Sequence, residues 1–194
     1  MDLKNSKTRC NLINSYIAEC LAMKRYELMA KAARQIGKYE VYEALTELHR
    51  NEAFHAEAFI KRLRGVVSDT DEKTDAGFPF RENGDLMHDL KVAADIEYDE
   101  SLNVYAGFAE TAQSEGFDDI AELFRLVGQV EHCHMMQLNE IRRQLHDDTM
   151  YERGHPVKWK CSNCGHEQTT DSAPLKCPLC GSDQGYVKLI LPDN

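Results

Sequence analysis

The sequence lacks two features that would place the protein at a membrane. No apolar run approaches the roughly 20 residues that a membrane-spanning helix requires. The first residues, MDLKNSK, lack the apolar core of a secretory signal. We therefore expect a cytoplasmic protein with no membrane among its partners.

Basic residues are also in short supply. The 194 residues contain 23 Lys and Arg against 33 Asp and Glu, which gives a formal net charge of -10. A negative chain is repelled by nucleic-acid phosphates and by anionic lipids. Part of this charge would be neutralised if carboxylates held metal ions, but nucleic acid is not an expected partner.

Cysteine, in contrast, is plentiful, because the chain contains seven. Four of them form two Cys-x-x-Cys pairs near the C-terminus, and Cys10, Cys20 and Cys133 are scattered. In a chain without a secretory signal, such pairs indicate metal binding in a reducing compartment rather than disulfides. We expect the three scattered cysteines to pack as small apolar residues.

Four stretches carry apolar residues at steps of three and four, which predicts helices. The predicted helices cover residues 6–36, 39–63, 85–114 and 118–145. Gly37, Gly65 and Gly116 follow the first three as C-caps. Asp118 or Asp119 is expected near the N-cap of the fourth. The sequence therefore predicts an all-α four-helix bundle.

A long connection separates the second predicted helix from the third. Residues 66–83 are rich in Asp, Thr, Gly and Lys and show no sustained period. This is long for a turn between adjacent helices, so we interpret it as a crossover between the two ends of a ferritin-like bundle. We expect its aromatic pair, Phe78 and Phe80, to anchor it.

Each half of the helical region carries one Glu-x-x-His motif. Glu52 precedes His55 in the second predicted helix, and Glu131 precedes His134 in the fourth. A carboxylate and an imidazole three residues apart lie on one face of a helix. One such pair is half of a metal site, and two facing pairs with further glutamates form the ligand set of a di-iron carboxylate bundle.

The spacing around these motifs repeats between the halves. A glycine, Gly37 or Gly116, lies 15 residues before the glutamate of each motif. A further glutamate, Glu19 or Glu97, lies 33 or 34 residues before it, and Glu100 follows Glu97 by three. The repetition indicates two related hairpins and a site of approximate two-fold symmetry, with one metal per half.

The predicted bundle thus directs five carboxylates and two imidazoles toward its interior: Glu19, Glu52, His55, Glu97, Glu100, Glu131 and His134. Buried charges without partners are strongly destabilising. Two ferrous ions, at +4 against -5, would nearly neutralise these carboxylates. Mixed oxygen and nitrogen ligation suits iron or manganese. We therefore predict a two-metal site.

Several neighbours of these residues allow more than one interpretation. A single glutamate on a helix is most often a solvated residue, so the prediction depends on the whole set. Tyr26 and Tyr105 are either core aromatics or hydrogen-bond donors behind the ligands. His132 points about 100° away from Glu131 on the helix, so we expect it behind the ligands or at the surface.

The chain changes character after residue 147. We predict a bundle domain over 1–147, a linker over 148–157 and a small module over 158–194. The module is too small to fold around a hydrophobic core alone. Four thiolates would hold a metal tetrahedrally in it: Cys161, Cys164, Cys177 and Cys180. Iron and zinc both suit such a site. A redox-active site in the same chain favours an iron that relays electrons.

In this order the motifs resemble those of the rubrerythrin family. The resemblance rests on six stretches: Tyr16 to Tyr26, Asn51 to Ala56, Glu97 to Tyr105, Glu131 to His134, Trp159 to Gly165, and Cys177 to Cys180. It implies a ferritin-like di-iron four-helix bundle followed by a small rubredoxin-like β module whose four cysteines hold an iron.

The resemblance also implies a role for each bundle ligand. Glu52 and Glu131 would bridge the two irons. The other ligands would divide between the irons, with Glu19 and Glu100 on one and Glu97 and His134 on the other. His55 would replace Glu100 when the first iron is reduced.

The expected function is that of a non-haem di-iron peroxidase, which reduces hydrogen peroxide to water with electrons relayed through the four-cysteine iron. The resemblance implies an NAD(P)H-dependent reductase or a separate rubredoxin as electron donor, and a homodimer. Two alternatives remain open. One is an iron-storage or ferroxidase protein of ferritin type, and the other is a metal-binding scaffold with zinc in the ribbon.

Overall fold

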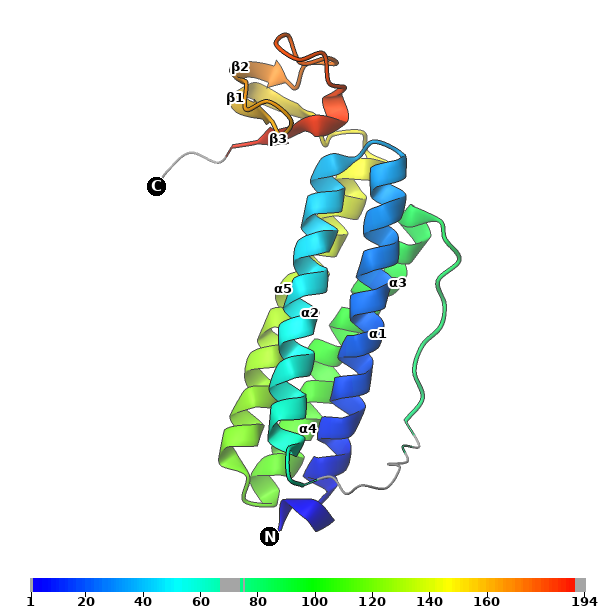
Figure 1. Ribbon diagram of the computed structural model, residues 1–194, viewed down its shortest axis with the longest axis vertical. Helices are drawn as coiled ribbons and strands as arrows, with labels where there is room; N and C mark the ends of the chain where they lie inside the picture. Colours follow the sequence, from blue (N-terminus) through cyan, green and yellow to red (C-terminus); the bar gives the residue numbers. More distant parts are fainter. Residues whose placement is uncertain (1, 67–73, 75, 191–194) are drawn as a thin grey trace.

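The computed structural model describes residues 2–66, 74 and 76–190 and forms a long helical bundle with a small β module at one end (Figure 1). A 3-10 turn, η1 (Leu3–Asn5), precedes the bundle. The bundle helices are α1 (Lys7–Gln35), α2 (Tyr39–Leu63), α3 (Leu86–Asp99), α4 (Tyr105–Ser114) and α5 (Asp118–His146). A π-helical turn, η2 (Glu100–Val104), joins α3 to α4. The four predicted helices are confirmed, and the third consists of α3, η2 and α4.

Both helical hairpins turn on a left-handed glycine. Gly37 has φ +74°, and the next amide, Lys38 N–H, donates to the carbonyl of Ala33. Gly116 has φ +86°, and Phe117 N–H donates to Ala112 in the same way. This pattern satisfies carbonyls at the helix end, and only glycine adopts the required φ without strain. The glycine repeat in the sequence is therefore a repeat of turn geometry.

The last helix begins one residue earlier than an aspartate cap would place it. Its N-cap is Phe117, which makes no side-chain capping bond. Asp118 and Asp119 lie in the first turn instead. Their charges interact favourably there with the positive end of the helix dipole.

The third predicted helix contains an interruption that the hydrophobic pattern does not indicate. In η2 the Tyr105 N–H donates to the carbonyl of Glu100, five residues back. Gly128 on α5 accommodates the widened turn, because a Cβ built there would lie 3.2 Å from Tyr105 Cβ and 3.5 Å from the Ser101 oxygen. The wider turn brings residue i+5 near residue i, so Tyr105 lies on the side of the helix that carries Glu100.

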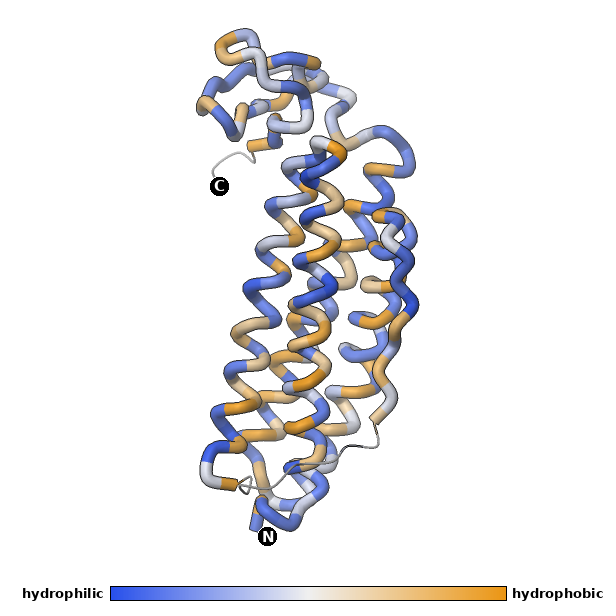
Figure 2. Tube along the Cα trace, turned by 45° about the vertical axis from the view of Figure 1, so that its right-hand side comes forward, coloured by the Kyte–Doolittle hydropathy of each residue, from blue (hydrophilic) through white to orange (hydrophobic). Residues whose placement is uncertain are grey.

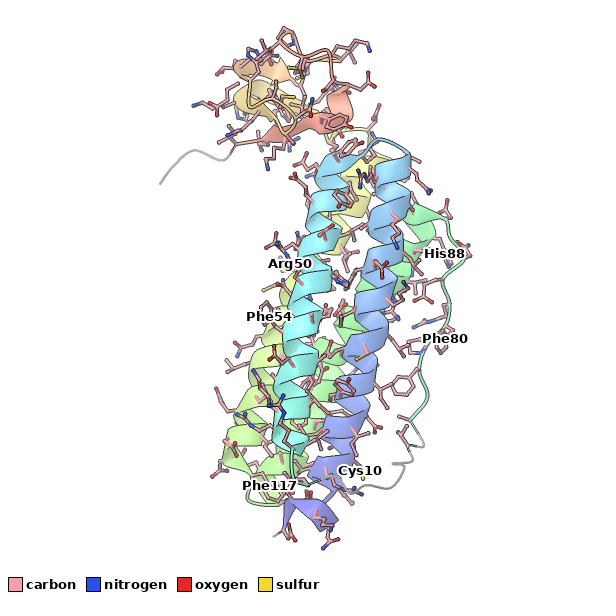
Figure 3. The ribbon with its side chains drawn as sticks, in the orientation of Figure 1. Cys10, Arg50, Phe54, Phe80, His88 and Phe117 are labelled. Carbon is pink, nitrogen blue, oxygen red and sulfur yellow. The ribbon has the colours of Figure 1, made fainter. Side chains whose placement is uncertain are left out.

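The described end of the crossover, residues 76–85, runs along the outside of α1 to the start of α3 (Figure 1). Residues 67–73 and 75 of the predicted crossover lie outside the described residues. Phe78 is half-buried, but Phe80 is 78% exposed (Figure 3), so the prediction that both aromatics anchor the segment is wrong for Phe80. Glu82 supplies a second anchor through an ion pair with the buried Arg25 of α1.

The apolar core is divided into two clusters. One surrounds Tyr26 and Leu48 and continues to Trp159 of the small module, and the other surrounds Phe59 and Phe124. Hydrophobic residues recur at intervals along every helix between hydrophilic ones (Figure 2). Burial of these faces drives helix association, and the polar layer between the two clusters holds the predicted metal ligands.

The small module is a three-stranded antiparallel sheet of order β2-β1-β3. Its elements are β1 (Glu152–Cys161), β2 (Glu167–Ser172), the 3-10 turn η3 (Gln184–Tyr186) and β3 (Val187–Leu189). The strand β1 starts inside the stretch predicted as a linker, with a register irregularity between Glu152 and Val157. Residues 191–194 of the predicted module lie outside the described residues.

The module contacts the bundle at the turn between α1 and α2. Tyr186 stacks on Tyr39 with ring centroids 3.7 Å apart. Gly185 lies so close to Gly37 that a Cβ built on it would collide with the Gly37 carbonyl oxygen. Lys188 pairs with Glu43 at 3.1 Å. These contacts place the module beside the α1–α2 turn.

The three scattered cysteines do not share one environment. Cys10 and Cys133 are exposed, and Cys20 is half-buried. The prediction that all three pack as apolar residues is therefore wrong for Cys10 and Cys133, which lie on outward faces of α1 and α5. Within the described residues, none of the helices combines the length and apolar character that crossing a membrane requires.

Candidate metal centres

Six of the seven predicted bundle ligands converge in the interior. They form two overlapping groups, in each of which the ligand atoms lie within 4.8 Å of one another: Glu19, Glu52, His55 and Glu131, and Glu52, Glu97, Glu131 and His134. Each of α1, α2, α3 and α5 contributes at least one member. Glu52 and Glu131 belong to both groups, so the two halves share them.

The shared carboxylates divide their oxygens between the halves. His55 Nδ1 lies 2.8 Å from Glu52 Oε2 and 3.0 Å from Glu131 Oε1. His134 Nδ1 lies 3.0 Å from the other Glu52 oxygen and 2.8 Å from the other Glu131 oxygen. Each carboxylate thus presents one oxygen to each half, which is the arrangement a bridging ligand needs.

These separations fit a metal ion in each half. Ligand atoms about 2.1 Å from a metal and at right angles to each other lie about 3 Å apart. Glu52 Oε1, both Glu131 oxygens and His134 Nδ1 are buried and have no hydrogen bond of good geometry in the described structure. Buried polar atoms normally have partners. A cation between them would provide the missing interaction.

The electrostatics of the metal-free site lead to the same conclusion. Burial and the charges of Glu131 and Glu52 raise the pKa of Glu19 and of Glu97 well above the ordinary value. Burial would raise the pKa of Glu52, but the two histidines lower it to about 2. The site therefore requires positive charge, which here comes from imidazolium groups.

The histidines carry that charge in the absence of metal. Burial alone would lower the pKa of both, but Glu131 and Glu52 raise the pKa of His55 to about 9 and that of His134 to about 10. Metal binding would displace these protons, because only neutral imidazole is a ligand.

A tyrosine lies behind the terminal carboxylate of each half. Tyr26 donates a hydrogen bond to Glu97, and Tyr105 donates one to Glu19. Both rings are fully buried. Of the two interpretations left open for these tyrosines, the structure supports hydrogen-bond donors behind the ligands, and they also pack in the core.

Glu100 is the predicted ligand that the structure does not bring into either group. It is half-buried and lies at the first position of η2. Burial and the charges of Glu131 and Glu52 raise the pKa of Glu100 to about 8. In this arrangement the Glu19 half contains His55 in place of Glu100.

Two residues near the site were not assigned a role from the sequence. Asn51 places its side-chain amide nitrogen 3.3 Å from His134 Nε2, the ring nitrogen that faces away from the carboxylates. In the sequence, Asn51 is marked only by its position directly before Glu52. Arg25, buried beside Tyr26, could have been suspected because it is a charged residue on an inward face. His132 is exposed, as one of the two expectations had it.

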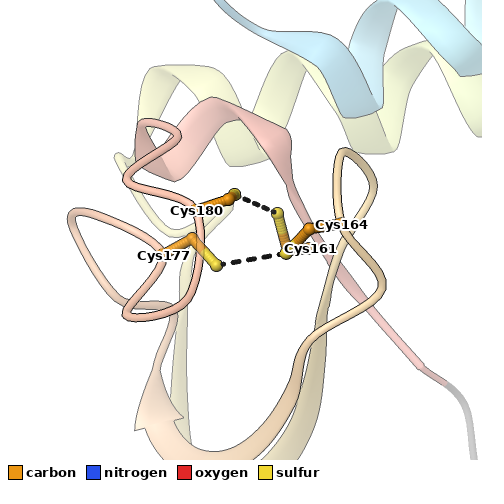
Figure 4. A group of neighbouring side chains, drawn as sticks. All are labelled: Cys161, Cys164, Cys177 and Cys180. Atoms are coloured by element: carbon orange, nitrogen blue, oxygen red, sulfur yellow. Dashed lines mark hydrogen bonds between the residues drawn. The ribbon is translucent and has the colours of Figure 1, made fainter.

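The second centre lies in the module, where the four predicted cysteines converge (Figure 4). The sulfur of Cys161 lies 3.8 Å from that of Cys180, and the sulfur of Cys164 lies 3.5 Å from that of Cys177. These distances exclude disulfides, which require about 2.05 Å. A tetrahedral metal with bonds of about 2.3 Å would place its sulfurs about 3.8 Å apart.

The surroundings of these thiols favour metal binding. Cys161 and Cys177 are buried, whereas Cys180 is exposed. The Ser182 hydroxyl and backbone amide lower the pKa of Cys180 to about 6, so it is a thiolate at neutral pH. Backbone bonds from Gly165 N–H to Cys161 and from Gly181 N–H to Cys177 close the two knuckles. A thiolate is the form that binds a metal.

Comparison with known proteins agrees with this pair of centres. The rubrerythrin family model matches residues 11–142, and the model of the rubrerythrin rubredoxin-like domain matches residues 159–187. A rubrerythrin of Clostridium perfringens is 33% identical over 187 residues, which cover 96% of each chain. A rubrerythrin of Porphyromonas gingivalis is 33% identical over 184 residues, which cover 95% of this chain and 90% of the relative.

Solved structures support the fold. A structure of nigerythrin has a TM-score of 0.63 at 19% identity and covers 96% of this chain and 87% of its own. A bacterioferritin of Desulfovibrio desulfuricans has a TM-score of 0.63 at 17% identity and covers 73% of this chain and 81% of its own. The chain therefore belongs to the rubrerythrin family, with the bundle di-iron site and the rubredoxin-like iron site of that family.

Proposed function

We propose that the protein is a non-haem di-iron peroxidase that reduces hydrogen peroxide to water. The observation that carries the proposal is the shared use of Glu52 and Glu131 by two ligand groups. Two metal ions held this way supply two electrons together, so that H2O2, two protons and two electrons yield two molecules of water. A two-electron step avoids the release of hydroxyl radical.

The protein side chains have distinct parts in this proposal. Glu52 and Glu131 span the two halves and hold their separation. The family resemblance assigns Glu100 to the half that contains His55, and of these two residues His55 is the one whose side chain lies against the shared carboxylates. We infer that these two residues exchange as ligands when the oxidation state changes. The hydrogen bond from Tyr105 would keep Glu19 in place during the exchange.

The cysteine centre would return electrons one at a time. Its exposed Cys180 offers a surface route from an external donor, for which we propose a separate rubredoxin or an NAD(P)H-dependent reductase. We also propose a homodimer in which the module of one subunit serves the bundle of the other. The single chain supports this, because the module lies at one end of the long bundle and the ligands lie between the two core clusters (Figure 1).

The test is a stoichiometric titration of the reduced protein without air. One peroxide is expected to oxidise two bundle irons, as followed by absorbance, with no radical adduct of a spin trap. Oxidation of one iron per peroxide with a trapped hydroxyl radical, or no oxidation, would contradict the proposal. Size-exclusion chromatography separates a dimer from the large shell that an iron-storage protein would form.

A further inference from the structure

A cavity of about 540 Å³ lies beside the bundle site, between α1, the described end of the crossover, η2 and α4. Asn14 and Ser15 line it from α1, Phe78 from the crossover, and Gly107 from α4. The space far exceeds the roughly 30 Å³ that one water molecule occupies in the liquid. Small polar molecules therefore fit inside it.

The cavity reaches the metal site from one side. Glu100 and Tyr105 are among the residues that line it, and Tyr105 donates a hydrogen bond to Glu19. None of the six converged ligands lines it, so the cavity is linked to the site through Glu100 and through the bond from Tyr105 to Glu19. The cavity therefore adjoins the half in which Glu100 stands apart from the converged ligands.

A buried residue that lines this cavity carries a hydroxyl group with no protein partner among the described residues. Ser15 is 2% exposed, and its Oγ makes no hydrogen bond within the described residues. Ser15 lies four residues before Glu19, on the same face of α1, and it lines the cavity. Because buried hydroxyls are normally hydrogen-bonded, this one indicates a polar guest. A serine hydroxyl can donate and accept, as can the hydroxyls of hydrogen peroxide.

We propose that this cavity is the route by which a small polar oxidant of the peroxide class reaches the bundle site, and that Ser15 binds the oxidant on the way. The proposal rests on the proposed peroxidase function. Glu100 lines the cavity and belongs to the half in which we propose an exchange of protein ligands. The oxidant would therefore reach the site at the half where that exchange takes place, and not at the half with Glu97 and His134.

The first test obstructs the route without touching a ligand. A Cβ built on Gly107 meets nothing within 4 Å, and its φ is not left-handed, so Gly107→Leu projects a side chain into open space. Ala32→Leu is the matched control, because Ala32 is also half-buried and lines other cavities beside α1. The probe is sodium azide, a small anion whose binding to the iron-loaded protein is followed by stopped-flow absorbance.

In Gly107→Leu the association and dissociation rates of azide should fall by the same factor, about tenfold, with an unchanged dissociation constant. Ala32→Leu should match the wild type. Unchanged rates in Gly107→Leu would overturn the proposal, and so would weaker binding through faster dissociation, since that indicates a distorted site. If Gly107→Leu does not fold, Ala18→Leu narrows the same cavity from α1.

The second test removes the hydroxyl. Ser15→Ala should raise the KM for peroxide about fivefold at unchanged kcat, as loss of one hydrogen bond does. Because Ser15 Oγ has no protein partner, the free energy of unfolding should not fall; a clear fall, or an unchanged KM, would overturn its assignment. The azide rates measure access to the bundle site even if the wild-type protein reduces no peroxide. A wrong access route and a wrong proposed function would therefore give different results.

Discussion

The two halves of the bundle site contain matching ligands in different surroundings. His55 and His134 both present Nδ1 to the shared carboxylates at 2.8–3.0 Å. A tyrosine supports the terminal carboxylate of each half. The symmetry ends there. The side chain of His134 is 3% exposed and has Asn51 beside its outer nitrogen, whereas that of His55 is 13% exposed.

The comparison teaches that an internal repeat reproduces ligands but not their environment. The half with His134 is closed, because a neighbour restrains the imidazole. The half with His55 is open, because Glu100 and the adjoining cavity lie next to it. We infer that the closed half holds its metal in one geometry, while the open half is the one that changes. Substitutions in each half, and removal of the metals, test this difference.

Glu52→Ala should break both halves at once, because Glu52 belongs to both ligand groups. We expect loss of both bundle metals and a loss of peroxide turnover greater than about 100-fold, since even residues behind metal ligands typically contribute 10- to 100-fold. Metal analysis and a steady-state assay check this. The visible spectrum of the cysteine centre should persist.

The matched control for that variant is Glu57→Ala. Glu57 lies on the outer face of the same helix and pairs with Lys61 at 2.9 Å. It should keep both metals. Normal metal content in Glu52→Ala would contradict the bridging assignment.

Removal of metal should reverse the pH dependence of stability. Without metal, the raised pKa values of Glu19, Glu97 and Glu100 (the last about 8) mean that the folded state keeps protons that the unfolded chain has released. The free energy of unfolding should therefore fall as the pH rises from 5 to 8, by roughly 3–4 kcal/mol from Glu100 alone. The raised pKa values of His55 and His134 act in the same direction above about pH 6.5. With metal it should rise, because ligand deprotonation favours binding.

Thermal unfolding followed by circular dichroism measures this difference. The increase in Tm on metal addition should be larger at pH 8 than at pH 5. Glu100→Gln, which removes one titrating group from the open half, should make the stability of the metal-free protein depend less on pH. A metal-free protein whose stability rises over this pH range would refute the account.

Asn51→Ala should weaken only the closed half. A ligating histidine is oriented by a partner at its other nitrogen, and loss of that partner typically costs 10- to 100-fold in affinity. We expect one of the two metals to bind about tenfold more weakly, as measured by anaerobic titration of the metal-free protein with Fe²⁺. With Nδ1 on a metal, His134 Nε2 keeps its proton, so the Asn51 amide must present its oxygen there in place of the nitrogen that lies 3.3 Å away. Asn51→Asp, which can only accept from Nε2, should therefore keep tight binding; equal weakening of both metals would argue against this role.

The smallest effects are expected from the paired variants Tyr26→Phe and Tyr105→Phe. Each removes one hydrogen bond to a carboxylate, with an expected net cost of roughly 1 kcal/mol in metal affinity. Tyr26→Phe should act on the half with Glu97 and Tyr105→Phe on the half with Glu19. Titration of both variants tests the assignment, and a shared effect on one metal would contradict it.

The sequence alone determined the parts of this protein that depend on local spacing. The Glu-x-x-His pairs share a helix face because the helical repeat requires it, and Gly37 and Gly116 turn the hairpins because other residues resist their φ. The Cys-x-x-Cys knuckles are equally local. For these features the spacing of residues in the sequence fixes how their side chains are arranged.

Contacts between residues far apart in the chain could be known only from the folded protein. Asn51 meets His134 across 83 residues, Arg25 meets Glu82 across 57, and the π-helical turn forms where Gly128 leaves room for it. No local pattern encodes such contacts, because they arise from how the helices pack. The candidate ligands could therefore be predicted from the sequence, while the difference between the closed and open halves required the folded bundle.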